Sequence, residues 1–174
     1  FGFTLCVMEM YGCRDPFLWG DKTMIDIPIR YYRDYAGAYD YGYETLGLPL
    51  NECALLVVDV DGTSPNPTTE GMIAPALHAA RASGMRVAYV HNDLRLVANR
   101  GNIVGEVWSR TKGISGDALA GWRNNASFEP EYLDCVKPRD DEPNFPKWIW
   151  SGFHDTFLDQ YLRSCGIRTL FAVG

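Results

Sequence analysis

Several features that would each point to a class of protein are absent from the 174-residue sequence, or scarce in it. Its 16 lysines and arginines are outnumbered by 22 acidic residues, and the net charge of −6 with no evident basic face argues against a nucleic-acid-binding protein. The longest apolar runs, such as CALLVV at 53–58, are far too short to cross a bilayer. No internal repeat or low-complexity segment occurs. What remains is a chain long enough for one domain with a real core.

The five cysteines are scattered along the chain and include no CxxC pair. Cys53 begins an apolar run and Cys165 lies on the apolar stripe of an expected helix. Both are better explained as small core residues than as disulfide partners. This usage favours a reducing compartment, and we expect a cytoplasmic protein.

Both ends of the sequence are unusual for a native chain. It begins FGFTLCVMEM, without an initiator methionine and without the basic start or the length of a signal peptide. It ends in GIRTLFAVG, an apolar pattern typical of a buried strand. We therefore expect the native start at Met8, at Met10 or further upstream, and an incomplete C-terminus.

Residues 1–50 form a tyrosine-rich N-terminal extension without a clear hydrophobic period. Its six clustered tyrosines are Tyr31, Tyr32, Tyr35, Tyr39, Tyr41 and Tyr43. Because tyrosine combines apolar area with a polar tip, such a segment suits an arm laid over a neighbouring surface. We expect it to pack on its own domain or on an oligomer partner; the alternative is an arm that lines a substrate pocket.

Residues 51–174 differ from the extension in their hydrophobic pattern and are predicted to form a second unit. The continuous apolar run CALLVVDV predicts a strand buried on both faces, and a helix over 72–83 follows, with Thr68 or Thr69 as its cap and Gly84 as its end. Residues 85–91 predict the next strand, which completes a βαβ unit. Residues 92–144 are polar, with short helices expected near 106–111 and 116–124, and a third apolar stretch lies at 147–150.

The clearest helix is expected over 155–166. Its apolar stripe is Leu158, Tyr161, Leu162 and Cys165, with Asp155 or Thr156 as cap and Gly166 as stop, and a strand at 167–173 follows. Strands that alternate with helices predict an α/β domain with a mainly parallel sheet. In such sheets ligands bind beyond the carboxyl ends of the strands. Asp59 and the 91–93 segment (His91, Asn92, Asp93) are therefore candidates for a site.

The stretch ALLVVDVDGT, residues 54–63, fits two kinds of enzyme. In a haloacid dehalogenase-like phosphatase Asp59 would be the nucleophile and Asp61 the acid, with Mg²⁺ between phosphate and carboxylates. That chemistry also needs a hydroxyl residue at the end of a later strand, where this chain has His91, and a later lysine and acidic pair. The sequence gives little support for these additional residues.

The second interpretation draws on residues 145–174, FPKWIWSGFHDTFLDQYLRSCGIRTLFAVG, which resemble the isochorismatase-like cysteine hydrolase family. In that family a lysine ends a strand, a serine-glycine-phenylalanine turn follows and a threonine opens a helix, as at Lys147, Ser151–Phe153 and Thr156. The stretch ALLVVDV also fits the family's first strand, which carries an acid. The resemblance covers roughly residues 53–174 and is weak from 95 to 140.

The resemblance implies a three-layer, Rossmann-like α/β sandwich and a triad of aspartate, lysine and cysteine. Carried over, Asp59 is the acid/base and Lys147 the cation, while the cysteine lies about half a dozen residues beyond the equivalent of Gly174. A nearby cation favours the thiolate that attacks a carbonyl, and a carboxylate shuttles its proton. The expected reaction is cleavage of a small amide or carbamoyl C–N bond without a cofactor.

The remaining expectations concern contacts. Asn92 and Arg95 follow the second strand and are expected to touch the small-molecule substrate. The aspartate-x-histidine spacing of nicotinamidase-like relatives is absent, so we predict no metal. Relatives commonly self-associate, so a homo-oligomer is expected. A third, non-enzymatic alternative is a degenerate member that binds a ligand or a partner through the tyrosine-rich arm.

Overall fold

A computed structural model describes residues 23–35, 38–93, 107, 110, 129–148 and 150–174. Its elements are, in chain order, β1 (Met24–Tyr35), β2 (Ala38–Pro49), η1 (Leu50–Glu52), β3 (Cys53–Val58), η2 (Thr69–Ile73), α1 (Ala74–Ser83), β4 (Arg86–Asn92), η3 (Asp134–Val136), β5 (Asn144–Lys147), α5 (Leu158–Ser164) and β6 (Thr169–Val173). Most of the stretch expected to hold two short helices, 106–124, lies outside these residues. No helix in the described ranges is long and apolar enough to span a bilayer.

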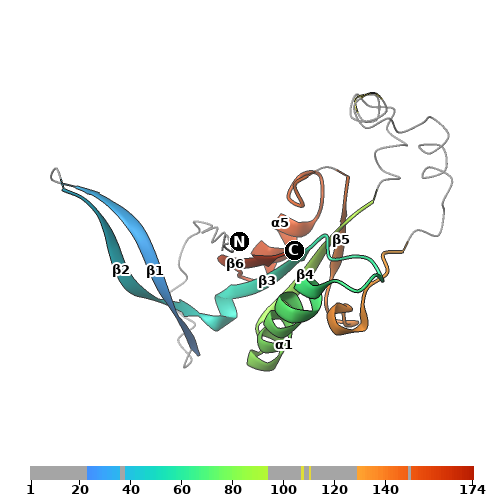
Figure 1. The fold of residues 1–174 in the computed structure, drawn as a ribbon, viewed down its shortest axis with the longest axis horizontal. Helices are drawn as coiled ribbons and strands as arrows, with labels where there is room; N and C mark the ends of the chain where they lie inside the picture. The colour runs from blue at the N-terminus through green and yellow to red at the C-terminus, as the bar shows by residue number, and fades with distance from the viewer. Residues whose placement is uncertain (1–22, 36–37, 94–106, 108–109, 111–128, 149) are drawn as a thin grey trace.

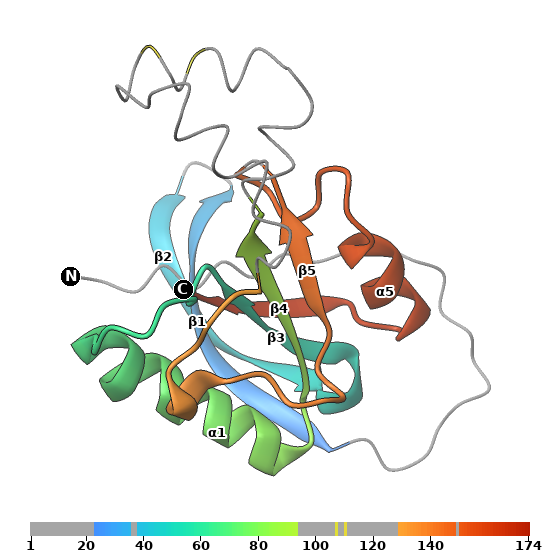
Figure 2. The ribbon, with the colours of Figure 1, turned by 90° about the vertical axis from the view of Figure 1, so that its right-hand side faces the viewer.

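The core is a parallel sheet with strand order β5-β4-β3-β6, covered by α1 on one face and α5 on the other (Figures 1 and 2). Alternate residues of β3 serve the two faces. Leu55 and Val57 pack toward Leu77 of α1, whereas Ala54 and Leu56 pack toward Leu162 of α5. The predicted three-layer α/β architecture is confirmed, and β3 is buried on both faces because helices cover both.

The helix ends are capped by ordinary interactions, but the capping residues differ in part from those predicted. The Oδ1 of Asn66 accepts hydrogen bonds from the N–H groups of Thr68 and Thr69, at 2.9 and 3.4 Å, so the cap before α1 is Asn66 and not either threonine. The N-cap of α5 is Phe157 and not Asp155 or Thr156, although Oγ1 of Thr156 accepts from the N–H of Leu158 at 3.1 Å. Gly84, with φ of 79°, ends α1 in the left-handed conformation that glycine adopts most easily.

Strand β5 covers Asn144–Lys147, so Lys147 ends the strand as the family resemblance implies. Trp150, at the end of the apolar stretch 147–150, follows the strand and is 82% exposed. The partner strand explains the end point. Asn92, the last residue of β4, pairs with Lys147, so residues beyond Lys147 have no ladder partner in that strand. Of the aromatic residues around Lys147, Phe145 therefore lies in the strand, whereas Trp148 and Trp150 follow it.

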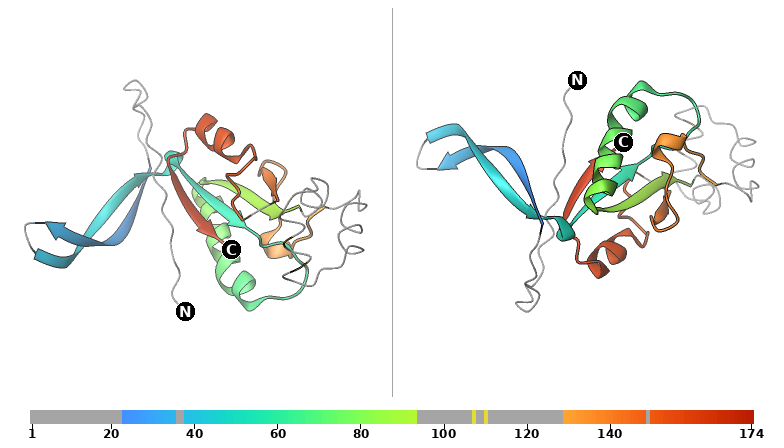
Figure 3. Two further views of the ribbon diagram at one scale, coloured as in Figure 1. Left: turned by 90° about the horizontal axis from the view of Figure 1, so that it is seen from above. Right: turned by 90° about the horizontal axis from the view of Figure 1, so that it is seen from below.

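Within the extension, β1 and β2 form an antiparallel hairpin that projects from the α/β body (Figures 1 and 3). No strands were predicted here, although apolar or aromatic residues alternate with polar or small ones over 25–31 and 39–44; Pro28 and Gly42 within these runs weaken the strand signal. Gly42 is buried under the ring of Tyr31, where an added Cβ would lie 2.5 Å from the ring. This cross-strand packing of an aromatic ring on a glycine helps to hold the register.

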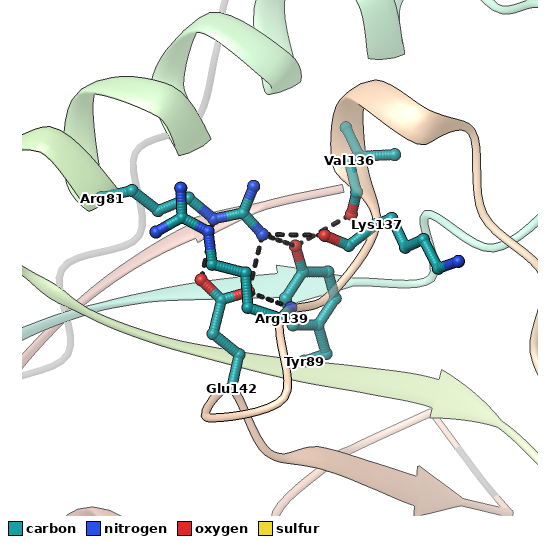
Figure 4. Close-up of polar contacts among 6 residues, drawn as sticks. All are labelled: Arg81, Tyr89, Val136, Lys137, Arg139 and Glu142. Atoms are coloured by element: carbon teal, nitrogen blue, oxygen red, sulfur yellow. Dashed lines mark hydrogen bonds and ion pairs between the residues drawn. The ribbon is translucent and has the colours of Figure 1, made fainter.

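A polar cluster ties the C-terminal end of α1 to the loop before β5 (Figure 4). The guanidinium of Arg81 donates to both oxygens of Glu142, at 2.8 and 2.6 Å, and to the carbonyl of Lys137 at 2.8 Å. The hydroxyl of Tyr89 donates to the carbonyl of Val136 at 2.9 Å. The cluster thus fixes the path of the chain from η3 to β5, and with it the strand that carries Lys147.

Burial by itself raises the pKa of Glu142, but hydrogen bonds from Arg81 and from the Arg139 N–H, together with their charges, outweigh it and leave the pKa below its ordinary value of 4.5. Because the side chains of Arg81 and Glu142 are only 13% and 7% exposed, we expect Glu142→Gln to lower the free energy of unfolding by about 2–3 kcal/mol. The exposed pair Arg163–Asp159 provides the control, since Asp159→Asn should cost less than about 0.5 kcal/mol.

The pH dependence of this difference is a further readout. A carboxyl with a lowered folded pKa contributes its stability in full above the ordinary value and loses it as the pH falls through the folded value. In thermal unfolding, the Tm gap between the wild type and Glu142→Gln should therefore be constant from about pH 7 to pH 5 and close at lower pH. A gap that widens on acidification would contradict this account.

Candidate active site

The carboxyl ends of β3, β4 and β5 bring three polar side chains together at one edge of the sheet. Asp59 directly follows β3, Asn92 is the last residue of β4 and Lys147 is the last residue of β5. Two main-chain bonds lock this edge: Asp59 N–H donates to the carbonyl of Val90 at 2.9 Å, and Asp93 N–H to that of Lys147 at 2.8 Å. Three segments far apart in the chain thus converge where ligands bind in parallel sheets.

The centre of this edge is the ammonium of Lys147. Its Nζ lies 2.9 Å from Oδ2 of Asp59 and donates to Oδ1 of Asn92 at 2.5 Å. The Lys147 side chain is 2% exposed and that of Asp59 is 39% exposed. A buried ammonium is tolerated only when it is paired and hydrogen-bonded, and both conditions are met at Lys147. The carboxylate, in contrast, is open to an incoming molecule.

Asp59 adopts φ of 52°, in the left-handed region that non-glycine residues rarely occupy. Aspartate tolerates this region better than most residues, and such strain is found disproportionately at functional sites. The turn brings the carboxylate from the end of β3 to the lysine at the end of β5, two strands away in the sheet. The backbone conformation therefore serves the position of the side chain.

A second polar group lies beside the first. Nδ1 of His91 is 2.7 Å from Oδ1 of Asn144, whose Nδ2 donates to the hydroxyl of Tyr132 at 2.8 Å. Burial raises the pKa of Tyr132, the bond from Asn144 opposes the rise, and the charges of Asp61 and Asp59 add to it, so the hydroxyl stays protonated. Tyr132 and Asn144 are not among the predicted site residues, because both lie in loop-like sequence without a motif.

The chain after β6 passes close to the same edge. The main chain of Gly174 approaches that of Val58, the residue before Asp59, so closely that an added Cβ would lie 2.0 Å from the Val58 carbonyl oxygen. Only glycine permits this approach. The glycine that the family resemblance singled out therefore lies beside the strand that carries the acid.

The other predicted residues have different positions. Arg95 lies outside the described residues. Asp61, the acid of the phosphatase alternative, is an exposed loop residue. In the part of the chain that the structure describes, no group of three or more His, Cys, Asp or Glu side chains is arranged to hold a metal ion. The prediction that the site uses no metal stays a prediction.

Comparisons with known proteins identify the relatives of this chain. The model of the isochorismatase domain matches residues 54–174. The ureidoacrylate amidohydrolase RutB of Methylorubrum extorquens is 31% identical over 121 residues, which make up 66% of this chain and 48% of that protein. The chain therefore spans about half the length of the curated relatives that it matches.

Solved structures were also compared with this chain. A cysteine hydrolase from Pseudomonas syringae pv. phaseolicola has a TM-score of 0.55 at 24% identity, with 73% of this chain and 61% of that chain covered. An N-carbamoylsarcosine amidase from Thermoplasma acidophilum has a TM-score of 0.49 at 26% identity, with 71% and 67% covered. The first of these likenesses supports the three-layer architecture described above.

We predict that Asn92→Ala lowers the free energy of unfolding by about 2 kcal/mol, because it removes an acceptor from a buried ammonium. Thermal or urea unfolding measures the change. Asn51→Ala provides the control, since Asn51 is exposed, and should shift stability by less than about 0.5 kcal/mol. Equal effects of the two substitutions would mean that Lys147 does not depend on Asn92.

Proposed function

Because the chain belongs to the isochorismatase family, we propose that it is the acid- and lysine-bearing part of a hydrolase that cleaves the C–N bond of a small amide or carbamoyl compound. The observation that carries the proposal is the contact between Asp59 and the buried ammonium of Lys147 at the carboxyl edge of the sheet. The relative RutB, an amidohydrolase of ureidoacrylate by its name, supports a ureido or similar carbamoyl substrate.

In the proposed reaction a cysteine thiol, supplied by chain that follows position 174, attacks the carbonyl carbon of the substrate. Asp59 takes the thiol proton, and the ammonium of Lys147 stabilises the thiolate. Asp59 then returns the proton to the departing nitrogen, which leaves as ammonia or an amine. Water, deprotonated by the same carboxylate, hydrolyses the acyl-enzyme and restores the thiol. Gly174 supports this assignment, since its main chain passes beside the strand of Asp59.

The environments of Lys147 and Asp59 suit the roles proposed for them. Lys147 is buried and held by two oxygens, so its charge is fixed in place before substrate arrives, which is the preorganisation that electrostatic catalysis requires. Asp59 is partly exposed and has a second oxygen that the contact with Lys147 leaves open. That oxygen is the one we assign to proton transfer.

We expect Asp59→Asn to reduce kcat for ammonia release from a ureido substrate by about 10²–10⁴-fold, since the amide cannot accept the proton. Lys147→Met should have a similar effect on kcat and also remove a buried charge pair. Asp61→Asn, which changes an exposed carboxylate two residues away, should retain activity within a few-fold of the wild type. Undiminished turnover in Asp59→Asn would refute the proposed mechanism and favour a ligand-binding protein.

Inhibition separates the thiol mechanism from the magnesium-dependent phosphatase interpretation. We expect activity to survive a chelator and to be lost on treatment with iodoacetamide, with substrate protecting. Cys135→Ser is the control, because Cys135 is the exposed free cysteine among the described residues and should not account for the loss. Peptide mapping of the alkylated protein then identifies the reactive cysteine. If the chelator abolished activity and iodoacetamide left it unchanged, the thiol mechanism would be refuted.

A further inference from the structure

One face of the β1–β2 hairpin presents an ordered, exposed set of aromatic side chains. This tyrosine face consists of Arg30, Tyr32, Asp34, Tyr39, Tyr41 and Tyr43, which share one side in the antiparallel register. Its tyrosines are 51–70% exposed. They nevertheless contact one another: the ring of Tyr32 lies 6.2 Å from that of Tyr39 and 5.9 Å from that of Tyr41, and the guanidinium of Arg30 lies 4.8 Å from the Tyr41 ring.

The hairpin needs a partner for physical reasons. A lone two-stranded hairpin is marginally stable in water, and three or more strands or a covering element are required for independent stability. Among the described elements, neither strand packs extensively on the α/β body, from which the hairpin projects (Figures 1 and 3). Large exposed aromatic surfaces of this kind mark interaction sites.

The two open edges of the hairpin differ in charge. Strand β2 carries Asp40 and Glu44 and no basic residue, so it offers no opposite charge to a second copy of itself. Strand β1 carries both signs near its tip, in the sequence RYYRD at 30–34. Pro28, which has no N–H to donate, interrupts the hydrogen-bonding edge of β1 nearer its start. The usable edge is therefore residues 29–35.

We propose that this edge pairs with the same edge of a second copy of the chain, antiparallel about a two-fold axis at Tyr32, to give a four-stranded sheet. In this register Arg30 faces Asp34 of the second copy, and Asp34 faces its Arg30. Tyr31 faces Arg33 on the opposite side of the sheet, and the two Tyr32 rings become neighbours. Every one of these cross-strand pairs is favourable, and the segment 29–35 pairs along its whole length.

Neighbouring registers lack this match. An axis at Arg30 places Arg30 against itself and Asp26 against Asp34, both like-charge pairs. An axis at Arg33 places Arg33 against itself. An axis at Tyr31 draws Pro28 into the ladder and pairs no opposite charges. Charge complementarity and the position of proline therefore select the register centred on Tyr32.

Charge reversal tests the register in the full chain. We expect Arg30→Glu to weaken the dimer about tenfold or more in sedimentation or light-scattering titrations, since two like-charge pairs replace two opposite pairs. The double variant Arg30→Glu/Asp34→Arg should restore wild-type dimerisation, because its charges are exchanged across the axis. Asp26→Arg is the matched control, on the same strand and face but before Pro28, and should leave the dimer unchanged. Failure of the double variant to recover would overturn the register.

Disulfide crosslinking can detect the dimer even if it is weak. Tyr32→Cys places two thiols opposite each other at the axis, and mild oxidation should give a disulfide-linked dimer that the wild type, with its own cysteines, does not form. Tyr43→Cys, on the same face but away from the axis, should not. Equal crosslinking at both positions, or a chain that stays monomeric at all concentrations, refutes the proposal. Neither readout depends on enzymatic activity.

Discussion

The buried ammonium of Lys147 is the constraint on which the carboxyl edge of the sheet depends. An ammonium at 2% exposure is sustainable only with close oxygen partners, and it has two, from the ends of two other strands. Asp59 and Asn92 must therefore meet β5 at one level, which requires the parallel register in which Asn92 pairs with Lys147. The cluster of Arg81 and Glu142 contributes from a distance, because it directs the chain into β5.

Much of this could be predicted from the sequence, for identifiable reasons. The run at 53–58 is apolar without alternation, which occurs when helices cover both faces of a strand, and the stripe of α5 has an unbroken period. These patterns led to the α/β fold and to Asp59 at a strand end. Lys147 was identified from the family resemblance of the residues around it. A lone lysine between a proline and a tryptophan has no feature that would distinguish it from an ordinary surface lysine.

What could not be predicted depends on contacts between distant segments. The substrate contact expected of Asn92 stays a prediction; what the sequence did not indicate is that Oδ1 of Asn92 accepts from Lys147, 55 residues away in the chain. The group of Tyr132, Asn144 and His91 likewise joins distant segments, and Tyr132 also pairs with Gly62 in the loop after β3. The hairpin was missed although the sequence carries a signal for it. Apolar or aromatic residues alternate with polar or small ones over 25–31 and 39–44, but Pro28 and Gly42 within these runs are unfavourable in strands.

In the proposed thiol mechanism, the charges of Asp59 and Lys147 restrict which proton transfers are possible. Asp59 and Lys147 together are neutral, and the lysine is too deeply buried to recruit counterions readily. A thiol that lost its proton to solvent would place two anions against one cation in a poorly solvated site. A thiol that passes its proton to Asp59 leaves one thiolate, one ammonium and a neutral carboxylic acid, so the net charge does not change. The partial exposure of Asp59 leaves room for this transfer, whereas the burial of Lys147 keeps the compensating charge in place.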